Sequence, residues 1–139
     1  MHLTDTWFAI EASVDEKPYL IRGREDIISF RKRGEHKSRI DIIFNYVTDD
    51  LNGMPNLPQL NLMEQVENSL VYELEHDIQG ILAFVYTGND HRVWYWYCKN
   101  VKETGERINK ALSSFPERMP LQMHSVEEPE WTAYNEILD

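Results

Sequence analysis

The segment 92–98 carries more aromatic side chains than any other stretch of this chain of 139 residues. Its sequence is Arg-Val-Trp-Tyr-Trp-Tyr-Cys, and side chains alternate between the two faces of a strand. Trp94 and Trp96 therefore point to one face, whereas Tyr95 and Tyr97 point to the other. A strand with large rings on both faces is typical of the interior of a sheet that is covered on both sides. We expect 92–98 to be a central strand.

Hydrophobic periodicity predicts the fold around this strand. Apolar and polar residues alternate on both sides of the turn formers 15–18, which predicts an N-terminal β-hairpin over about 5–23. From residue 38 onward the expected order is strand, helix, strand, strand, helix, strand, over 39–46, 59–77, 79–86, 91–98, the residues after Asn100, and 121–126. That order is the β-α-β-β-α-β pattern of a ferredoxin-like α+β sandwich, in which 39–46 and 91–98 are neighbouring central strands.

The length is typical of a single domain, so we expect 1–139 to fold as one unit. Its ferredoxin-like core spans about 38–126, and a short C-terminal helix spans about 128–138. Trp131 and Tyr134 lie on one side of that helix, and we interpret them as the anchors by which it docks. The segment 24–37 carries no clear pattern, and its structure stays open.

The charge pattern restricts the partners. A formal net charge of −10 repels phosphates and argues against nucleic-acid binding. An RNA recognition motif would also need a glycine before its aromatics, which 92–97 lacks. Seven of the fourteen Lys and Arg residues nevertheless lie within 22–39, giving that segment a net charge of +4. Its adjacent Arg31, Lys32 and Arg33 are either a solvated surface or a docking patch for an acidic partner.

The sheet face that the helices of such a fold leave uncovered is a second candidate surface. Trp94 and Trp96 are candidate anchors for a protein partner there, and a homodimer through the same face is an alternative. The alternation leaves open which aromatic set of 92–98 faces that side. A pocket between the sheet and the N-terminal hairpin would instead use the polar groups of Asp41, Tyr95 and His124.

No motif points to catalysis. Cys98 is the only cysteine and lies within the aromatic strand, so we interpret it as a small buried thiol. The five histidines are scattered, and without a second cysteine no thiolate metal site can form, so we expect neither metal nor cofactor. No phosphate-binding loop or nucleophile elbow is present. The lack of a disulfide, of a signal peptide and of a membrane-spanning run favours a cytoplasmic protein.

Two segments resemble a known family. The ending Glu128-Pro129-Glu130-Trp131-Thr132-Ala133-Tyr134 is similar to the "D/E-P-x-W-x-x-Y" ending of the bacterial domain of unknown function 695, with Glu128 where that family often has Asp. The pair of strands over 86–97 is similar to that family's "T…G…R-x-W-x-x-Y" pair, and Trp7 and Gly53-Met54-Pro55 occur in the expected order. The resemblance covers nearly the whole chain and supplies no catalytic residues.

The resemblance also suggests a role. In some bacterial proteins this kind of domain is joined to one that resembles the RraB inhibitor of ribonuclease E, itself a small acidic ferredoxin-like protein. By that analogy we expect a regulatory or protein-interaction domain without catalytic activity, acting on an unidentified protein partner. Two alternatives stay open: an enzyme or binder of a small molecule in a pocket on the sheet face, and an immunity protein that neutralises a basic toxin.

Overall fold

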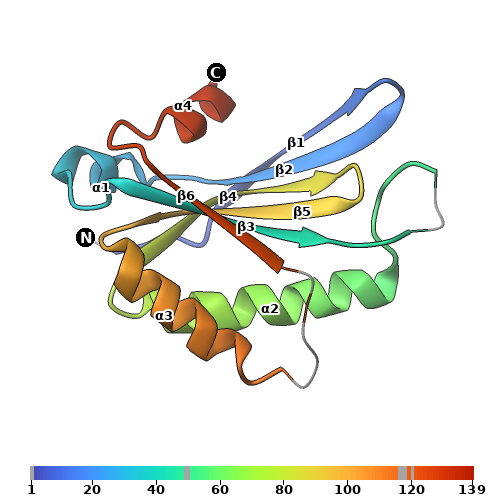
Figure 1. The fold of residues 1–139 in the computed structure, drawn as a ribbon. Coiled ribbons are helices and arrows are strands. Elements are labelled where there is room, and N and C mark those ends of the chain that lie inside the picture. Colours follow the sequence, from blue (N-terminus) through green and yellow to red (C-terminus); the bar gives the residue numbers. More distant parts are fainter. Residues whose placement is uncertain (1, 49–50, 116–118, 120) are drawn as a thin grey trace.

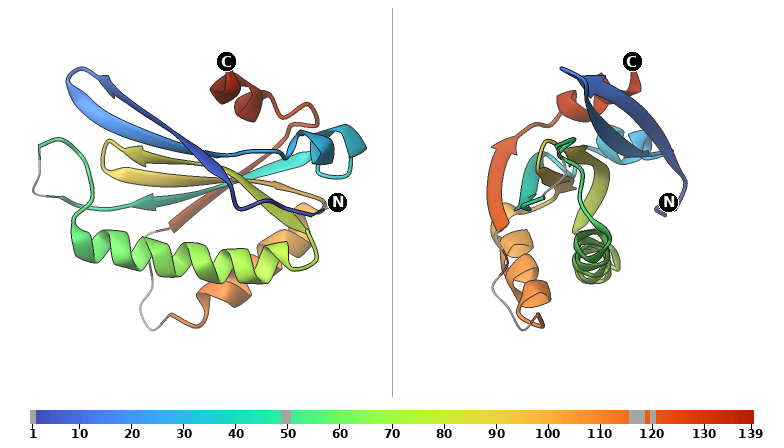
Figure 2. Two further views of the ribbon diagram at one scale, coloured as in Figure 1. Left: turned by 180° about the vertical axis from the view of Figure 1, so that it is seen from behind. Right: turned by 90° about the vertical axis from the view of Figure 1, so that its right-hand side faces the viewer.

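The computed structural model describes residues 2–48, 51–115, 119 and 121–139, and its described strands form one antiparallel sheet (Figure 1). Two helices lie below the sheet, and two shorter ones lie above one end of it (Figures 1 and 2). The elements are β1 (Trp7–Val14), β2 (Lys17–Arg24), α1 (Ile28–Arg33), β3 (Ser38–Asn45), α2 (Leu57–Glu75), β4 (Gly80–Gly88), β5 (His91–Cys98), α3 (Val101–Leu112), β6 (Leu121–Glu127) and α4 (Thr132–Leu138).

The sheet order is β1-β2-β4-β5-β3-β6, which places the aromatic strand β5 between β4 and β3. The predicted α+β class, the N-terminal hairpin and the pairing of β3 with β5 are confirmed. The order of elements along the whole chain differs from a bare β-α-β-β-α-β unit, because the hairpin and α1 precede that series and α4 follows it. Helix α1 lies within 24–37, the segment that carries no clear sequence pattern.

Helix α2 begins at a capping box. The Asn56 side chain accepts from the Gln59 N–H at 2.9 Å, and the Gln59 side chain accepts from the Asn56 N–H at 2.8 Å. Its buried residues recur at spacings of three or four, and Leu60, on the same stripe, is 37% exposed. The stripe consists of Met63, Val66, Leu70 and Leu74, all fully buried. Neither α2 nor any other described helix has the length and apolarity that crossing a bilayer requires.

Helix α3 begins after Asn100, whose side chain accepts from the Glu103 N–H at 2.8 Å. Thr104, Ile108 and Ala111 are buried, whereas Val101 is 40% exposed. The core between α2, α3 and the lower sheet face contains Trp94 and Trp96, both fully buried. Helices therefore cover this face of β5.

The upper face is covered at one end by α1 and α4 (Figure 2). The buried residues of this second core come from strands β4 and β5, from helices α1 and α4, and from the residues that flank those helices. They are Ile27, Phe30, Ile81, Ala83, Phe84, Tyr97, Trp131 and Tyr134. Both faces of β5 are thus buried over Trp96, Tyr97 and Cys98, as the composition of this strand predicts.

Gly53, in the connection between β3 and α2, fixes that connection to the β4–β5 turn. Its carbonyl accepts from the Tyr46 hydroxyl at 2.7 Å and from the Asp90 N–H at 3.0 Å. Its φ is +75°, and a Cβ at this position would lie 3.1 Å from backbone atoms of Asn89. Only glycine meets both the dihedral and the space requirement.

We predict that Gly53→Ala lowers the free energy of unfolding by about 2–3 kcal/mol, because strain at positive φ adds to a clash with backbone that cannot move aside. Gly34→Ala is the matched control, because Gly34 also has positive φ (72°) but open space around a Cβ. It should cost only about 1 kcal/mol. Urea denaturation measures both values, and equal losses would contradict the close approach at Gly53.

Candidate functional site

The uncovered part of the upper sheet face carries half-buried aromatic and aliphatic side chains. It lies between the hairpin β1–β2 and helices α1 and α4 (Figure 1). Cross-strand partners such as Ile21 and Tyr86 place these side chains on one face. We call this surface the open sheet face, and its residues are Ile10, Tyr19, Ile21, Ile43, Tyr86, His91 and Tyr95.

Three rings form a ladder across this face. Tyr19 stacks on Tyr86 with ring centroids 5.6 Å apart, and Tyr86 stacks on His91 at 5.3 Å. A cleft of about 290 Å³ adjoins the ladder and is lined by Tyr19 and Tyr86 together with the ends of both hairpins. Burial raises the pKa of Tyr86 and of Tyr95, so both phenols stay protonated at neutral pH. The open sheet face therefore presents apolar rings with uncharged polar tips.

Asp41, Tyr95 and His124, the polar groups predicted for a pocket, lie in one row across β5, β3 and β6. Asp41 is buried and accepts from the Arg39 guanidinium at 2.8 and 3.2 Å. The same guanidinium lies 5.6 Å from the centre of the Tyr95 ring, while His124 is exposed. None of the three lines any of the clefts described in this section. The structure brings these residues together in a row, with the carboxylate already paired.

Trp94 and Trp96 are not exposed, and their interpretation as anchors for a partner is corrected. Both rings lie under α2 and α3 with no exposed surface, because the helices cover the face to which they point. The Trp94 indole N–H donates to Glu67 at 3.0 Å. The rings available to a partner belong to the opposite side of the sheet.

The three basic residues of α1 differ in their surroundings. Arg31 donates to the Asn135 side chain of α4 at 2.6 Å, so it contributes to helix docking. Lys32 is exposed, and the exposed Arg33 pairs with Glu35 at 3.2 Å. Of the three, Lys32 and Arg33 are exposed to solvent.

The C-terminal sequence motif has a structural role. The Glu128 carboxylate accepts from the Ala133 N–H at 2.7 Å, from Arg39 at 2.7 Å and from the Tyr97 hydroxyl at 3.1 Å. The ring of Trp131 stacks on Tyr97 at 4.3 Å, although its φ of 55° is rare for a bulky residue. Glu128 therefore joins the start of α4 to the sheet, and the Trp131 ring packs onto the sheet at Tyr97.

The two aromatic residues of this motif are both buried, Trp131 with no exposed surface and Tyr134 with 1%. The Trp131 indole N–H donates to the His36 carbonyl at 2.8 Å, and the Tyr134 hydroxyl donates to the Arg24 carbonyl. Their interpretation as docking anchors agrees with this burial. Neither ring is available to a ligand.

A second cleft, of about 550 Å³, lies between the N-terminal segment, β2 and α2. Trp7 lines this cleft, with the guanidinium carbons of Arg22 and Arg24 each 4.8 Å from the ring centroid. Arg24 is buried and donates to Glu75 at 2.7 and 3.0 Å, and Arg22 pairs with Glu67. The buried Nε of Arg24 has no hydrogen-bond partner.

Sequence reasoning missed this Trp7 cleft, although its signal was present. Arg22 and Arg24 share one face of a strand because they are two residues apart. Glu67 and Glu75 share one face of a helix because they are eight residues apart. These spacings do not reveal that the arginines of β2 pair with the glutamates of α2, because that pairing depends on the tertiary fold.

Reactive or metal-binding groups are not assembled in the described part of the chain. Cys98 is fully buried, and burial raises the pKa of its thiol, as expected for an inert cysteine. Among residues 2–48, 51–115, 119 and 121–139, no group of His, Cys, Asp and Glu could hold a metal ion.

The fold and these surfaces define an α+β domain whose buried charged groups are paired with one another. The sequence profile of DUF695, described as a family of unknown function, matches residues 5–138, and the chain belongs to that family. The resemblance predicted from the two motifs is therefore confirmed. No curated protein and no solved structure matches the chain.

We predict that Trp131→Ala lowers the free energy of unfolding by about 3–5 kcal/mol, since it removes a fully buried ring that stacks on Tyr97. Leu138→Ala, in the same helix at 46% exposure, should cost less than about 1 kcal/mol. Thermal and urea denaturation measure both. A loss below about 1 kcal/mol for Trp131→Ala would mean that α4 is not part of the folded core.

Proposed function

We propose that this chain is a protein-interaction domain without catalytic activity, and that it binds a protein partner through the open sheet face. The observation that carries the proposal is the ladder Tyr19–Tyr86–His91, which is half-exposed beside a small cleft. Tyrosine rings next to a pocket are the groups that dominate binding energy at protein interfaces. The carboxylates of Asp41, Glu67 and Glu75 also support a non-catalytic role, because each forms an ion pair with an arginine.

The wider role that we propose is regulatory and cytoplasmic, in a bacterial cell. The distant similarity in size, charge and element order to RraB-type inhibitors of ribonuclease E supports this by analogy. We also infer that β3, α2, β4, β5, α3 and β6 form a ferredoxin-like unit. Their order along the chain and the sheet order β4-β5-β3-β6 support that inference.

The test compares two tyrosine variants in affinity capture from the native cytosol at physiological salt, with mass spectrometry as the readout. Tyr86→Ser removes the central ring of the ladder and should reduce recovery of the partner at least tenfold, because such anchors contribute about 2 kcal/mol or more. Tyr72→Ser removes a tyrosine that is 79% exposed on α2, away from the open sheet face, and should leave recovery unchanged.

Equal recovery by both variants and the wild type would overturn the proposed surface. Melting temperatures of both variants, measured beforehand, separate loss of binding from loss of folding. A basic toxin as the captured partner would make the chain an immunity protein. Lys32→Glu with Arg33→Glu tests the basic residues in the same assay, because neither side chain holds α4.

A second candidate function is binding of a small molecule in the Trp7 cleft. Its volume of about 550 Å³ suits a metabolite, and the unpartnered Arg24 Nε offers a buried donor. A ligand with a hydrogen-bond acceptor and an apolar portion would fit the arginines, Trp7 and Val71 that line the cleft.

We predict that such a ligand raises the melting temperature of the wild type by several degrees in a metabolite screen. Asn68→Trp, at an exposed position that lines the cleft, should abolish the rise by filling it. Gln65→Trp, at an exposed position of α2 outside the cleft, should retain it. A screen without any stabilising compound, or an equal rise in both variants, would contradict binding at this cleft.

A further inference from the structure

His36 lies in the connection between α1 and β3 and is 2% exposed. Its imidazole Nε2 lies 2.8 Å from the carbonyl oxygen of Ile78, in the connection between α2 and β4. Its own carbonyl accepts from the indole N–H of Trp131, at the start of α4, at 2.8 Å. The ring also meets Phe30 of α1 edge-on, with ring centroids 6.1 Å apart. One histidine thus joins segments that are distant in the sequence, at one end of the sheet (Figure 1).

The contacts of the His36 ring define its protonation state. A carbonyl oxygen can only accept, so Nε2 carries the proton and donates it to Ile78. The second ring nitrogen, Nδ1, is buried and has no hydrogen-bond partner among the described residues. Protonation would make Nδ1 a buried donor without an acceptor and would place a charge in this site, and both changes are costly. This arrangement therefore fits the neutral imidazole and not the imidazolium.

The nearest charged groups do not compensate for a charge on His36. Arg33 at the end of α1 and Lys99 after β5 both disfavour the imidazolium, whereas Glu35 favours it. Glu35 is exposed, and its carboxylate already pairs with Arg33 at 3.2 Å and with Lys99 at 3.7 Å. Burial, together with the two cations, therefore holds the pKa of His36 below its ordinary value.

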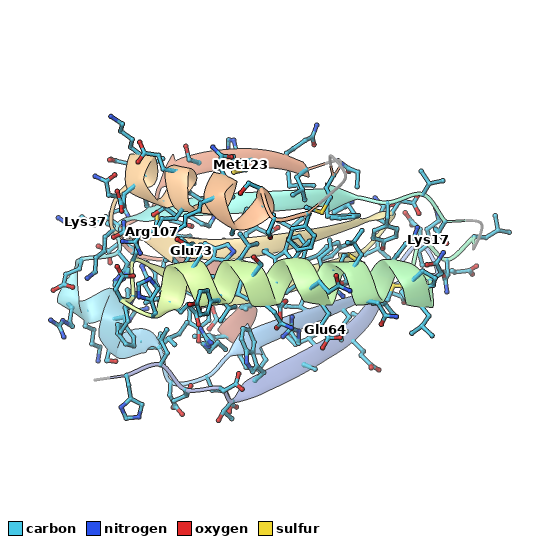
Figure 3. The ribbon with its side chains drawn as sticks, turned by 90° about the horizontal axis from the view of Figure 1, so that it is seen from below. Lys17, Lys37, Glu64, Glu73, Arg107 and Met123 are labelled. Carbon is cyan, nitrogen blue, oxygen red and sulfur yellow. The ribbon has the colours of Figure 1, made fainter. Side chains whose placement is uncertain are left out.

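The other elements packed against this histidine bring acids that are paired with other cations. Asp77, in the α2–β4 connection, pairs with Arg107 of α3 at 2.8 Å. Glu128, before α4, pairs with Arg39 at 2.7 Å. Lys37, which follows the histidine in the sequence, lies at the same end of the molecule as Arg107 (Figure 3) and adds a further cation. The charges around this site thus favour a neutral ring.

Ile78 holds a backbone conformation that a β-branched residue rarely adopts, with a φ of 56°. Such strained residues persist only where surrounding contacts enforce them. Here the imidazole of His36 binds the Ile78 carbonyl, and the Ile78 N–H donates to the Glu75 carbonyl at 3.2 Å. Ile78 also lines the Trp7 cleft. Loss of the imidazole bond would release this strain beside that cleft and free the Trp131 indole from the His36 carbonyl.

We propose that His36 is an acid-sensitive lock, closed by the neutral imidazole and opened when the ring takes up a proton. Opening separates the α1–β3 connection from Ile78 and from Trp131. In the open state His36 is in water, with an ordinary pKa of about 6.5, whereas the closed state binds the proton more weakly. The closed state is therefore fully favoured above that ordinary pKa, and its advantage falls as the pH drops below it.

The first test follows the imidazole ¹⁵N signals of the wild-type chain by NMR as the pH is lowered. At neutral pH His36 should carry its proton on Nε2, and it should titrate at least about one pH unit below His124, which is exposed on β6. A proton on Nδ1, or titration of His36 together with His124, would overturn the lock.

The second test measures the opening equilibrium from hydrogen exchange of the Trp131 indole N–H, corrected for the intrinsic effect of pH on exchange. Between about pH 7.5 and about pH 5.5 the opening constant should rise about tenfold, because the open-state imidazole takes up its proton in this interval. His36→Gln retains a donor for Ile78 but cannot titrate, so its constant should change less than about twofold. His124→Gln is the matched control and should show the wild-type rise.

An unchanged wild-type constant, or an equal rise in His36→Gln, would overturn the proposal. The lock goes beyond the proposed partner binding and is separable from it. Lys17, which lines the cleft beside the ladder, lies at the opposite end of the molecule from Lys37 (Figure 3). His36→Gln should therefore capture the partner as well as the wild type at neutral pH. Failure of capture by the wild type would overturn only the proposed function, and failure of the two tests above only the lock.

Discussion

Tyr97 joins the central strand β5 to the C-terminal segment that covers one end of the upper sheet face. Its ring stacks on Trp131, its hydroxyl donates to Glu128, and the same hydroxyl accepts from the Tyr134 N–H at 3.3 Å. Burial raises the pKa of this phenol, so it stays a hydrogen-bond donor throughout the physiological range. The contacts hold the C-terminal segment against β5 and cover one end of the upper face. The rest of that face is not covered by this segment.

This arrangement determines which groups are available for function. Arg39 pairs with both Asp41 and Glu128, and Arg24 pairs with Glu75, so these groups hold neighbouring elements together. Breaking such a buried pair is costly, because it leaves an uncompensated charge. The ladder Tyr19–Tyr86–His91 remains half-exposed. Such rings suit contact with another polypeptide, which is why we favour an interaction domain over an enzyme.

The composition of β5 was sufficient to predict its central position and burial, since rings on both faces require cover on both sides. Alternation also separated Trp94 and Trp96 from Tyr95 and Tyr97 correctly. Alternation contains no information on which face the long helices cover, so it leaves open which aromatic set is exposed, and Trp94 and Trp96, named as candidate anchors, are the buried set. Helix α1 was not predictable either, because it has six residues and no side-chain cap, and is held by burial of Phe30. The Trp7 cleft was not predicted, because it depends on the pairing of β2 with α2, which are distant in the sequence.

The most direct test of this account is native-state hydrogen exchange, read by NMR at the Trp131 indole N–H and the Tyr134 backbone N–H. If the C-terminal motif is part of the core, both should exchange only through global unfolding, at the rate of the slowest amides of β5. Exchange at those sites many times faster than in β5 would show that α4 opens locally. That result would contradict a structural role for the motif and return Trp131 and Tyr134 to the residues available for a partner.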